Sequence, residues 1–87
     1  MRLQQITKEE TQMMQQAYIF LTRHCNPPAN QEEDAVDWWT ETAKEAGELD
    51  AAWSGNPLIR EILLALINYI EHKAKVLTEE KNHVSEL

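Results

Sequence analysis

Two short clusters of helix-breaking residues divide this 87-residue chain into three long uninterrupted segments. The clusters are NPPAN at 26–30 and SGNP at 54–57, and they hold all three prolines and one of the two glycines. Proline cannot continue the interior of a helix, and the residue before it avoids the α region. A β protein would need turn residues about every eight to twelve positions. The scarcity of such residues therefore predicts an all-α fold with three long helices.

The first two segments carry apolar residues at helical intervals, each after a helix-capping pattern. Thr7 with Glu10, and Asn30 with Glu33, have the spacing of a capping side chain and its reciprocal partner. The first apolar stripe contains Met14, Ala17, Tyr18, Leu21 and Cys25, and Met13 and Phe20 widen it on one flank. The second contains Ala35, Trp39, Thr42, Ala46, Leu49 and Trp53. These patterns predict helices over 7–25 and 31–53.

The third segment predicts the central helix of the fold. Gly55 can adopt the left-handed conformation after a helix, Asn56 can cap the next helix, and Pro57 fits its first position. The apolar arc that follows is broad and contains Ile59, Ile62, Leu63, Leu66, Ile70 and Leu77, with further apolar residues on both flanks. Such an arc requires two packing partners. We therefore predict a helix over 57–77 that is packed by the other two.

The connections between the predicted helices are short, so neighbouring helices should run antiparallel. The predicted architecture is a compact three-helix antiparallel bundle with the third helix central, forming a single domain over 1–77. Helical periodicity ends at Thr78, and 78–87 is predicted to be a frayed helix end or a flexible tail. The alternative architecture is a helical hairpin that completes its core only as a homodimer.

The net charge of −7 arises from one segment of the chain. Residues 31–50 include eight acidic side chains and one basic side chain, whereas the remaining seven acids and seven bases cancel. The lysines and arginines are scattered and form no face that could neutralise phosphates, which argues against direct nucleic-acid binding.

The cysteine content and the apolar runs indicate where the chain works. Cys25 is the only cysteine, which excludes an intramolecular disulfide and indicates a reducing compartment. The first residues lack the apolar region of a signal peptide, and the longest apolar run, ILLALI at 62–67, is far below the roughly 20 residues of a membrane span. We expect a cytoplasmic protein without membrane contact.

No residue pattern indicates catalysis or a cofactor. His24 and Cys25 are adjacent and cannot both point inward, and no pair of histidines or cysteines has the spacing of metal ligands. We expect Cys25 to be a small core residue and His24, His72 and His83 to be solvated. The serines lack a glycine elbow, and no glycine-rich phosphate loop is present. The expectation is therefore a protein that is not an enzyme and holds neither metal nor cofactor.

The second predicted helix carries a stripe of acidic residues beside its apolar stripe. The acidic stripe is centred about 120° from the apolar one. Trp38 lies between the two stripes, whereas Trp39 and Trp53 belong to the apolar one. We predict a partner-binding site made of Asp34, Asp37, Trp38, Glu41, Glu45 and Glu48. The alternative is a solvated face on which Trp38 covers the gap beside the first or the third helix.

Residues 37–75, DWWTETAKEAGELDAAWSGNPLIREILLALINYIEHKAK, combine a tryptophan-bearing acidic helix, a tight turn with proline and a leucine-rich helix that ends in lysines. This layout resembles the small acidic all-helical accessory proteins of bacterial prophages and integrative elements. The resemblance implies an accessory protein that acts by contact with a host protein or an element-encoded protein, including action as an inhibitor.

Three functions are consistent with these observations. The first is a cytoplasmic protein-interaction module that acts through the acidic face of the second helix, with Trp38 at its edge. The second is an inhibitor of a nucleic-acid-binding protein, in which carboxylates take the place of phosphates. The third is a structural homo-oligomer, in which the face that carries Trp38 is buried between identical chains.

Overall fold

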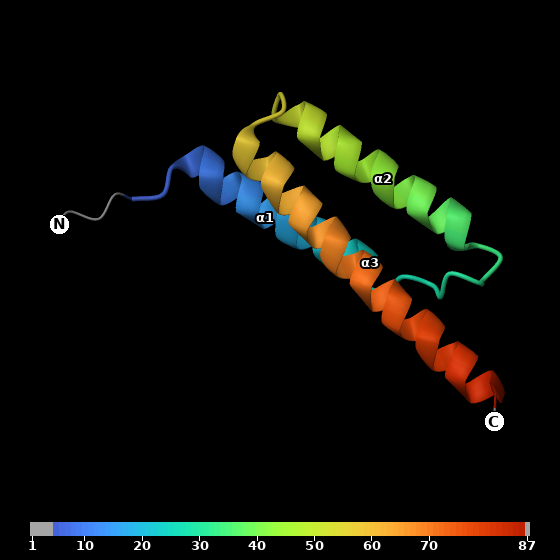
Figure 1. Cartoon of the computed structure of the whole chain (residues 1–87). Helices are drawn as coiled ribbons and strands as arrows, with labels where there is room; N and C mark the ends of the chain where they lie inside the picture. Colours follow the sequence, from blue (N-terminus) through green and yellow to red (C-terminus); the bar gives the residue numbers. More distant parts are fainter. Residues whose placement is uncertain (1–4, 87) are drawn as a thin grey trace.

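The chain folds into three α-helices that pack side by side in an up-down-up arrangement. The computed structural model describes the backbone of residues 5–86 and the side chains of residues 5–80. The helices are α1 (Lys8–His24), α2 (Ala35–Ala52) and α3 (Pro57–Glu86), and the described residues form no strand. Each helix contacts the other two, and α2 runs antiparallel to α1 and α3 (Figure 1). The predicted all-α antiparallel bundle is confirmed.

Local capping signals place the first turns of α1 and α3. The Thr7 hydroxyl accepts a hydrogen bond from the Glu10 amide at 3.0 Å, and the Glu10 carboxylate accepts one from the Thr7 amide at 2.8 Å. Gly55 adopts a φ of +67°, and the Asn56 side chain accepts a hydrogen bond from the Leu58 amide at 2.9 Å. The predicted capping box of α1 and the predicted turn before α3 are therefore confirmed.

The predicted start of the second helix is wrong. α2 begins at Ala35 instead of residue 31, and its N-cap residue Asp34 makes no side-chain capping bond. The backbone N–H of Asn30 donates instead to the Thr78 hydroxyl at 2.8 Å, and the neighbouring Ala29 is completely buried. Docking of this loop on α3 replaces the local Asn30–Glu33 cap, and the chain forms turns until Ala35.

The stripe with which α1 faces the core is shifted by about one position from the centre of the predicted one, toward its predicted flank of Met13 and Phe20. Its buried residues are Met13, Ala17, Phe20 and His24. Met14 is 48% exposed, Tyr18 is 67% exposed, and Cys25 is the half-buried C-cap residue instead of a core residue. The prediction failed because α1 has apolar residues around much of its circumference, so their spacing alone does not select the packing face.

The hydrophobic core lies between the three helices. Its buried cluster consists of Met13, Ala17, Phe20, Ala46, Ile59, Leu63 and Ile70, with all three tryptophans half-buried against it. On α2, the predicted stripe faces inward, since Ala35, Thr42 and Ala46 are buried.

α3 continues to Glu86, so the boundary predicted at residue 77 lies inside the helix. Ala74 is buried, and Thr78 donates a hydrogen bond to the Ala74 carbonyl while it accepts the one from Asn30. The 26–30 loop thus packs on this part of α3 and supports it. Beyond the loop, α3 extends past the ends of α1 and α2 (Figure 1).

Candidate functional site

The acidic face of α2 holds three carboxylates without an ion-pair partner among the described residues. Asp37, Glu41 and Glu48 are exposed, and they follow one another at intervals of four and seven residues, which places them on one side of the helix. Asp34, at the N-cap position, is also exposed. The exposed part of the predicted site therefore consists of these four acids.

Glu45 lies in the same stripe but is engaged by α1. Its carboxylate forms an ion pair with the Arg23 guanidinium at 2.8 Å and a hydrogen bond with the His24 Nε2 at 2.5 Å, and its side chain is only 26% exposed. The hydrogen bond with His24 lowers the pKa of Glu45 below its usual value, and the positive charge of Arg23 acts in the same direction. Glu45 thus holds α2 against the end of α1, and its charge is compensated inside the chain.

The expectation that His24 is solvated is wrong. His24 is 7% exposed, and its ring lies 4.8 Å from the Phe20 ring, centroid to centroid. Its Nδ1 lies 3.0 Å from the hydroxyl oxygen of Thr42, which is 1% exposed. The spacing contained a usable signal, since His24 follows Phe20 by four residues and Ala17 by seven, but a histidine is read as polar in a hydropathy pattern.

Thr42, His24 and Glu45 form a hydroxyl, imidazole and carboxylate series like that of a hydrolytic triad. The buried Thr42 hydroxyl lies 2.9 Å from the Trp38 carbonyl, to which it donates along the helix. A nucleophile needs access to a substrate carbonyl, and this oxygen has none. We therefore interpret the series as a polar contact that fixes α2 against α1.

Trp38 and Trp39 are both half-buried and pack on the core from adjacent positions. The Trp38 ring meets the His24 ring edge-on at a centroid distance of 5.9 Å, and it meets the Trp39 ring edge-on at 4.9 Å. Trp38 therefore covers the buried histidine of α1, and Trp39 lines a shallow hollow along α2 and Asn30. Adjacent tryptophans are accommodated because each one covers a different part of the core edge.

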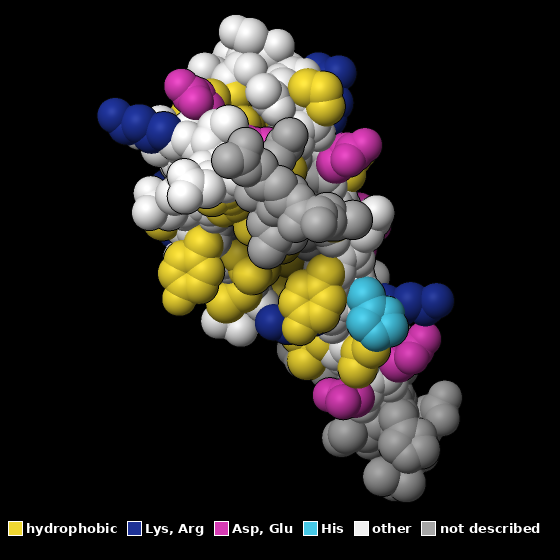
Figure 2. Space-filling model, turned by 90° about the vertical axis from the view of Figure 1, so that its left-hand side faces the viewer, with side chains coloured by type: hydrophobic (Ala, Val, Ile, Leu, Met, Phe, Trp, Pro, Cys, Tyr) yellow, Lys and Arg dark blue, Asp and Glu magenta, His cyan; other side chains and the backbone are white. Residues whose placement is uncertain are grey.

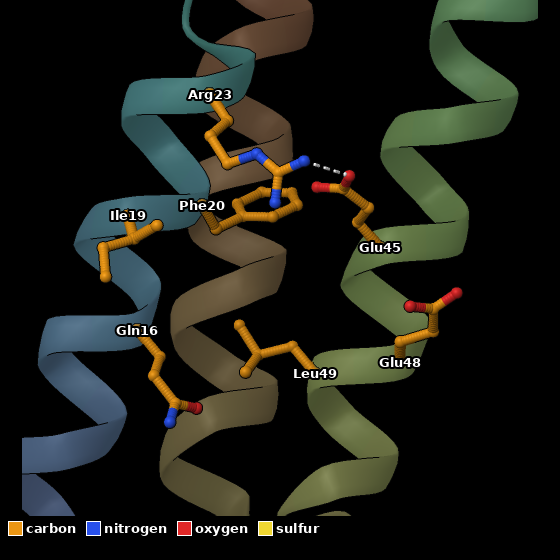
Figure 3. Close-up of a pocket in the computed structure, with 7 residues that line it drawn as sticks. All are labelled: Gln16, Ile19, Phe20, Arg23, Glu45, Glu48 and Leu49. Carbon is orange, nitrogen blue, oxygen red and sulfur yellow. Dashed lines mark hydrogen bonds and ion pairs between the residues drawn. The ribbon is translucent and has the colours of Figure 1, made fainter.

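A groove between α1 and α2 adjoins the acidic stripe. It has a volume of about 330 Å³ and is lined by Gln16, Ile19, Phe20 and Arg23 of α1 and by Glu45, Glu48 and Leu49 of α2. The Arg23–Glu45 ion pair closes one end, and the Phe20 and Leu49 side chains extend into the space between the helices (Figure 3). Ile19 is 54% exposed. The groove could not be predicted from the sequence, because it depends on how α1 and α2 pack.

Metal-ligand groups and membrane-spanning helices were looked for in the described residues. No group of three or more His, Cys, Asp or Glu side chains within residues 5–80 is placed to hold a metal ion. No helix in the described part of the chain combines the length and apolar character that crossing a bilayer requires.

None of the protein-family models, curated proteins or solved structures compared with this chain matches it.

Proposed function

We propose that this chain is a cytoplasmic protein-interaction module and that it binds its partner through the surface formed by α1 and α2. The observation that carries the proposal is the combination of unpaired carboxylates at Asp37, Glu41 and Glu48 with an adjoining apolar groove. Like charges at this spacing on a helix cost a few tenths of a kcal/mol per pair. A complementary partner would convert that cost into a favourable contact.

The surface is chemically suited to a partner with basic side chains around an apolar one. Lysine or arginine would pair with the three carboxylates at the rim, where charges chiefly determine the association rate and the choice of partner. An apolar side chain would enter the groove and contact Phe20, Leu49 and the exposed Ile19. The resemblance of residues 37–75 to prophage accessory proteins leads us to propose a host or element-encoded protein as this partner.

Mimicry of nucleic acid is less well supported by the charge spacing. The rise from Asp37 to Glu48 is about 16 Å, which gives one unpaired charge per roughly 8 Å because Glu45 is compensated by α1. One strand of DNA carries a phosphate every 3.4 Å or so, about twice that density. A homo-oligomer built on the Trp38 face is also less well supported, since Trp38 already packs on His24 within one chain.

The test compares the proteins captured by the natural chain with those captured by two variants of equal net charge. The first variant carries Asp37→Asn, Glu41→Gln and Glu48→Gln. The control variant carries Glu9→Gln, Glu61→Gln and Glu71→Gln. These are exposed carboxylates outside the stripe that form no ion pair within the described part of the chain. We expect the partner to be lost from the first variant and retained by the control; retention by both would refute the proposed site.

A further inference from the structure

The second half of α3 forms an open groove with the 26–30 loop, separate from the α1–α2 surface. The groove has a volume of about 460 Å³ and is lined by Asn26, Pro27, Tyr69, His72, Lys73, Val76, Leu77 and Glu80. Tyr69 is 53% exposed and Val76 is 39% exposed. Hydrophobic side chains lie next to basic, acidic and histidine side chains over this part of α3 (Figure 2). The Tyr69 and Val76 side chains thus leave apolar surface exposed beside the Lys73 ammonium group, which lies 5.5 Å from the Tyr69 ring centroid.

Polar side chains of opposite hydrogen-bonding character flank Val76 in the groove. His72 lies four residues before Val76 and Glu80 lies four residues after it, so the three follow one face of the helix. Lys73 supplies a cation on the side of His72, and its ammonium group donates to the Cys25 carbonyl at the end of α1. Along the helix, the face therefore carries an imidazole and an ammonium group, then an apolar centre, then a carboxylate.

A second α3 placed antiparallel on this face would meet its own complement. With a two-fold axis at Val76, residue 72 of one copy lies opposite residue 80 of the other, and the two Val76 side chains meet at the centre. His72 and Lys73 of each copy then face Glu80 of the other, at both ends of the contact. Such a self-complementary patch is what a two-fold symmetric interface requires, whereas an unrelated partner has no need of this symmetry.

We propose that this groove is a homodimer interface in which the α3 helices of two copies pair antiparallel about Val76. The extension of α3 past α1 and α2 allows a second helix to approach (Figure 1). A contact made by one helix and one loop is at the small end of specific interfaces, so the dimer forms with rising protein concentration. The interface shares no residue with the α1–α2 surface.

The test measures the molar mass of the full chain by sedimentation over a range of concentrations. Glu80→Lys places a like charge opposite Lys73, and His72→Glu places a like charge opposite Glu80. Each variant alone should raise the dimer dissociation constant by about tenfold or more. An equal mixture of the two variants should restore dimers, because each altered charge then meets its opposite.

The matched control is Glu71→Lys, which makes the same charge change as Glu80→Lys at an exposed position about 180° away on α3. It should dimerise like the natural chain, and circular dichroism should show all variants to be equally helical. A natural chain that stays monomeric up to its solubility limit would overturn the proposal. So would unchanged dimerisation of Glu80→Lys, or a mixture of the two variants that fails to recover dimers.

Discussion

The contact between Glu45 and the end of α1 gives the sharpest prediction on stability. Arg23 is 61% exposed at its side chain, so its ion pair with Glu45 contributes about 0–1 kcal/mol. The His24 side chain is only 9% exposed, and its hydrogen bond to a carboxylate contributes about 1.5–3 kcal/mol. Glutamine can still accept a neutral hydrogen bond worth about 0.5–1.5 kcal/mol. Glu45→Gln should therefore lower the free energy of unfolding by about 1–2 kcal/mol.

Urea unfolding at pH 7, followed by tryptophan fluorescence, measures this loss. The matched control is Glu48→Gln, which makes the same chemical change one turn away on an exposed, unpaired side chain and should stay within about 0.5 kcal/mol of the natural chain. Equal stability of the two variants would refute the reasoning, because it would mean that the pairing with His24 and Arg23 contributes nothing.

The stability difference between the natural chain and Glu45→Gln should change with pH in a definite direction. The pKa of Glu45 is lower in the folded chain than its ordinary value of 4.5, so the unfolded chain binds more protons in this range and stability rises with pH. The contribution is complete above the ordinary value and is lost as the pH falls through the lower, folded value. The stability difference between the natural chain and Glu45→Gln should consequently shrink in acid; a difference that grows there would contradict this account.

Three further substitutions test the packing. Thr42→Val should cost about 1–3 kcal/mol in urea unfolding, because it leaves His24 Nδ1 without a partner in a buried position. Gly55→Ala should cost about 1 kcal/mol or more in the same assay, since its φ of +67° is a backbone conformation that residues with a Cβ rarely adopt. Trp38→Ala and Trp39→Ala should each lower the free energy of unfolding by about 2–4 kcal/mol, because both rings are half-buried on the core. Urea unfolding of these two variants is measured by circular dichroism. A Trp38→Ala chain as stable as the natural one would contradict the packing described.

The parts of the fold that could be predicted depend on neighbours in the sequence. The Thr7–Glu10 box and the Gly55–Asn56–Pro57 turn are local, and both are observed. The start of α2 could not be predicted because Asn30 bonds to Thr78, 48 residues away. A tertiary hydrogen bond thus replaced the local capping signal.

The candidate site also has a part that the sequence could predict and a part that it could not. A helical wheel places Asp37, Glu41 and Glu48 on one face, and all three are exposed. The pairing of Glu45 with His24 joins residues 21 positions apart. That contact depends on which face of α1 turns inward. The spacing of apolar residues could not predict this face, because α1 has apolar residues on several sides.

Carboxyl footprinting of the chain with and without its captured partner tests the central claim most directly. A carbodiimide and an amine label exposed carboxylates, and mass spectrometry reports the labelling of each acidic residue. The account predicts that the partner protects Asp37, Glu41 and Glu48 while Glu61 and Glu71 stay as reactive as in the free chain. Undiminished labelling of those three residues in the complex would contradict it.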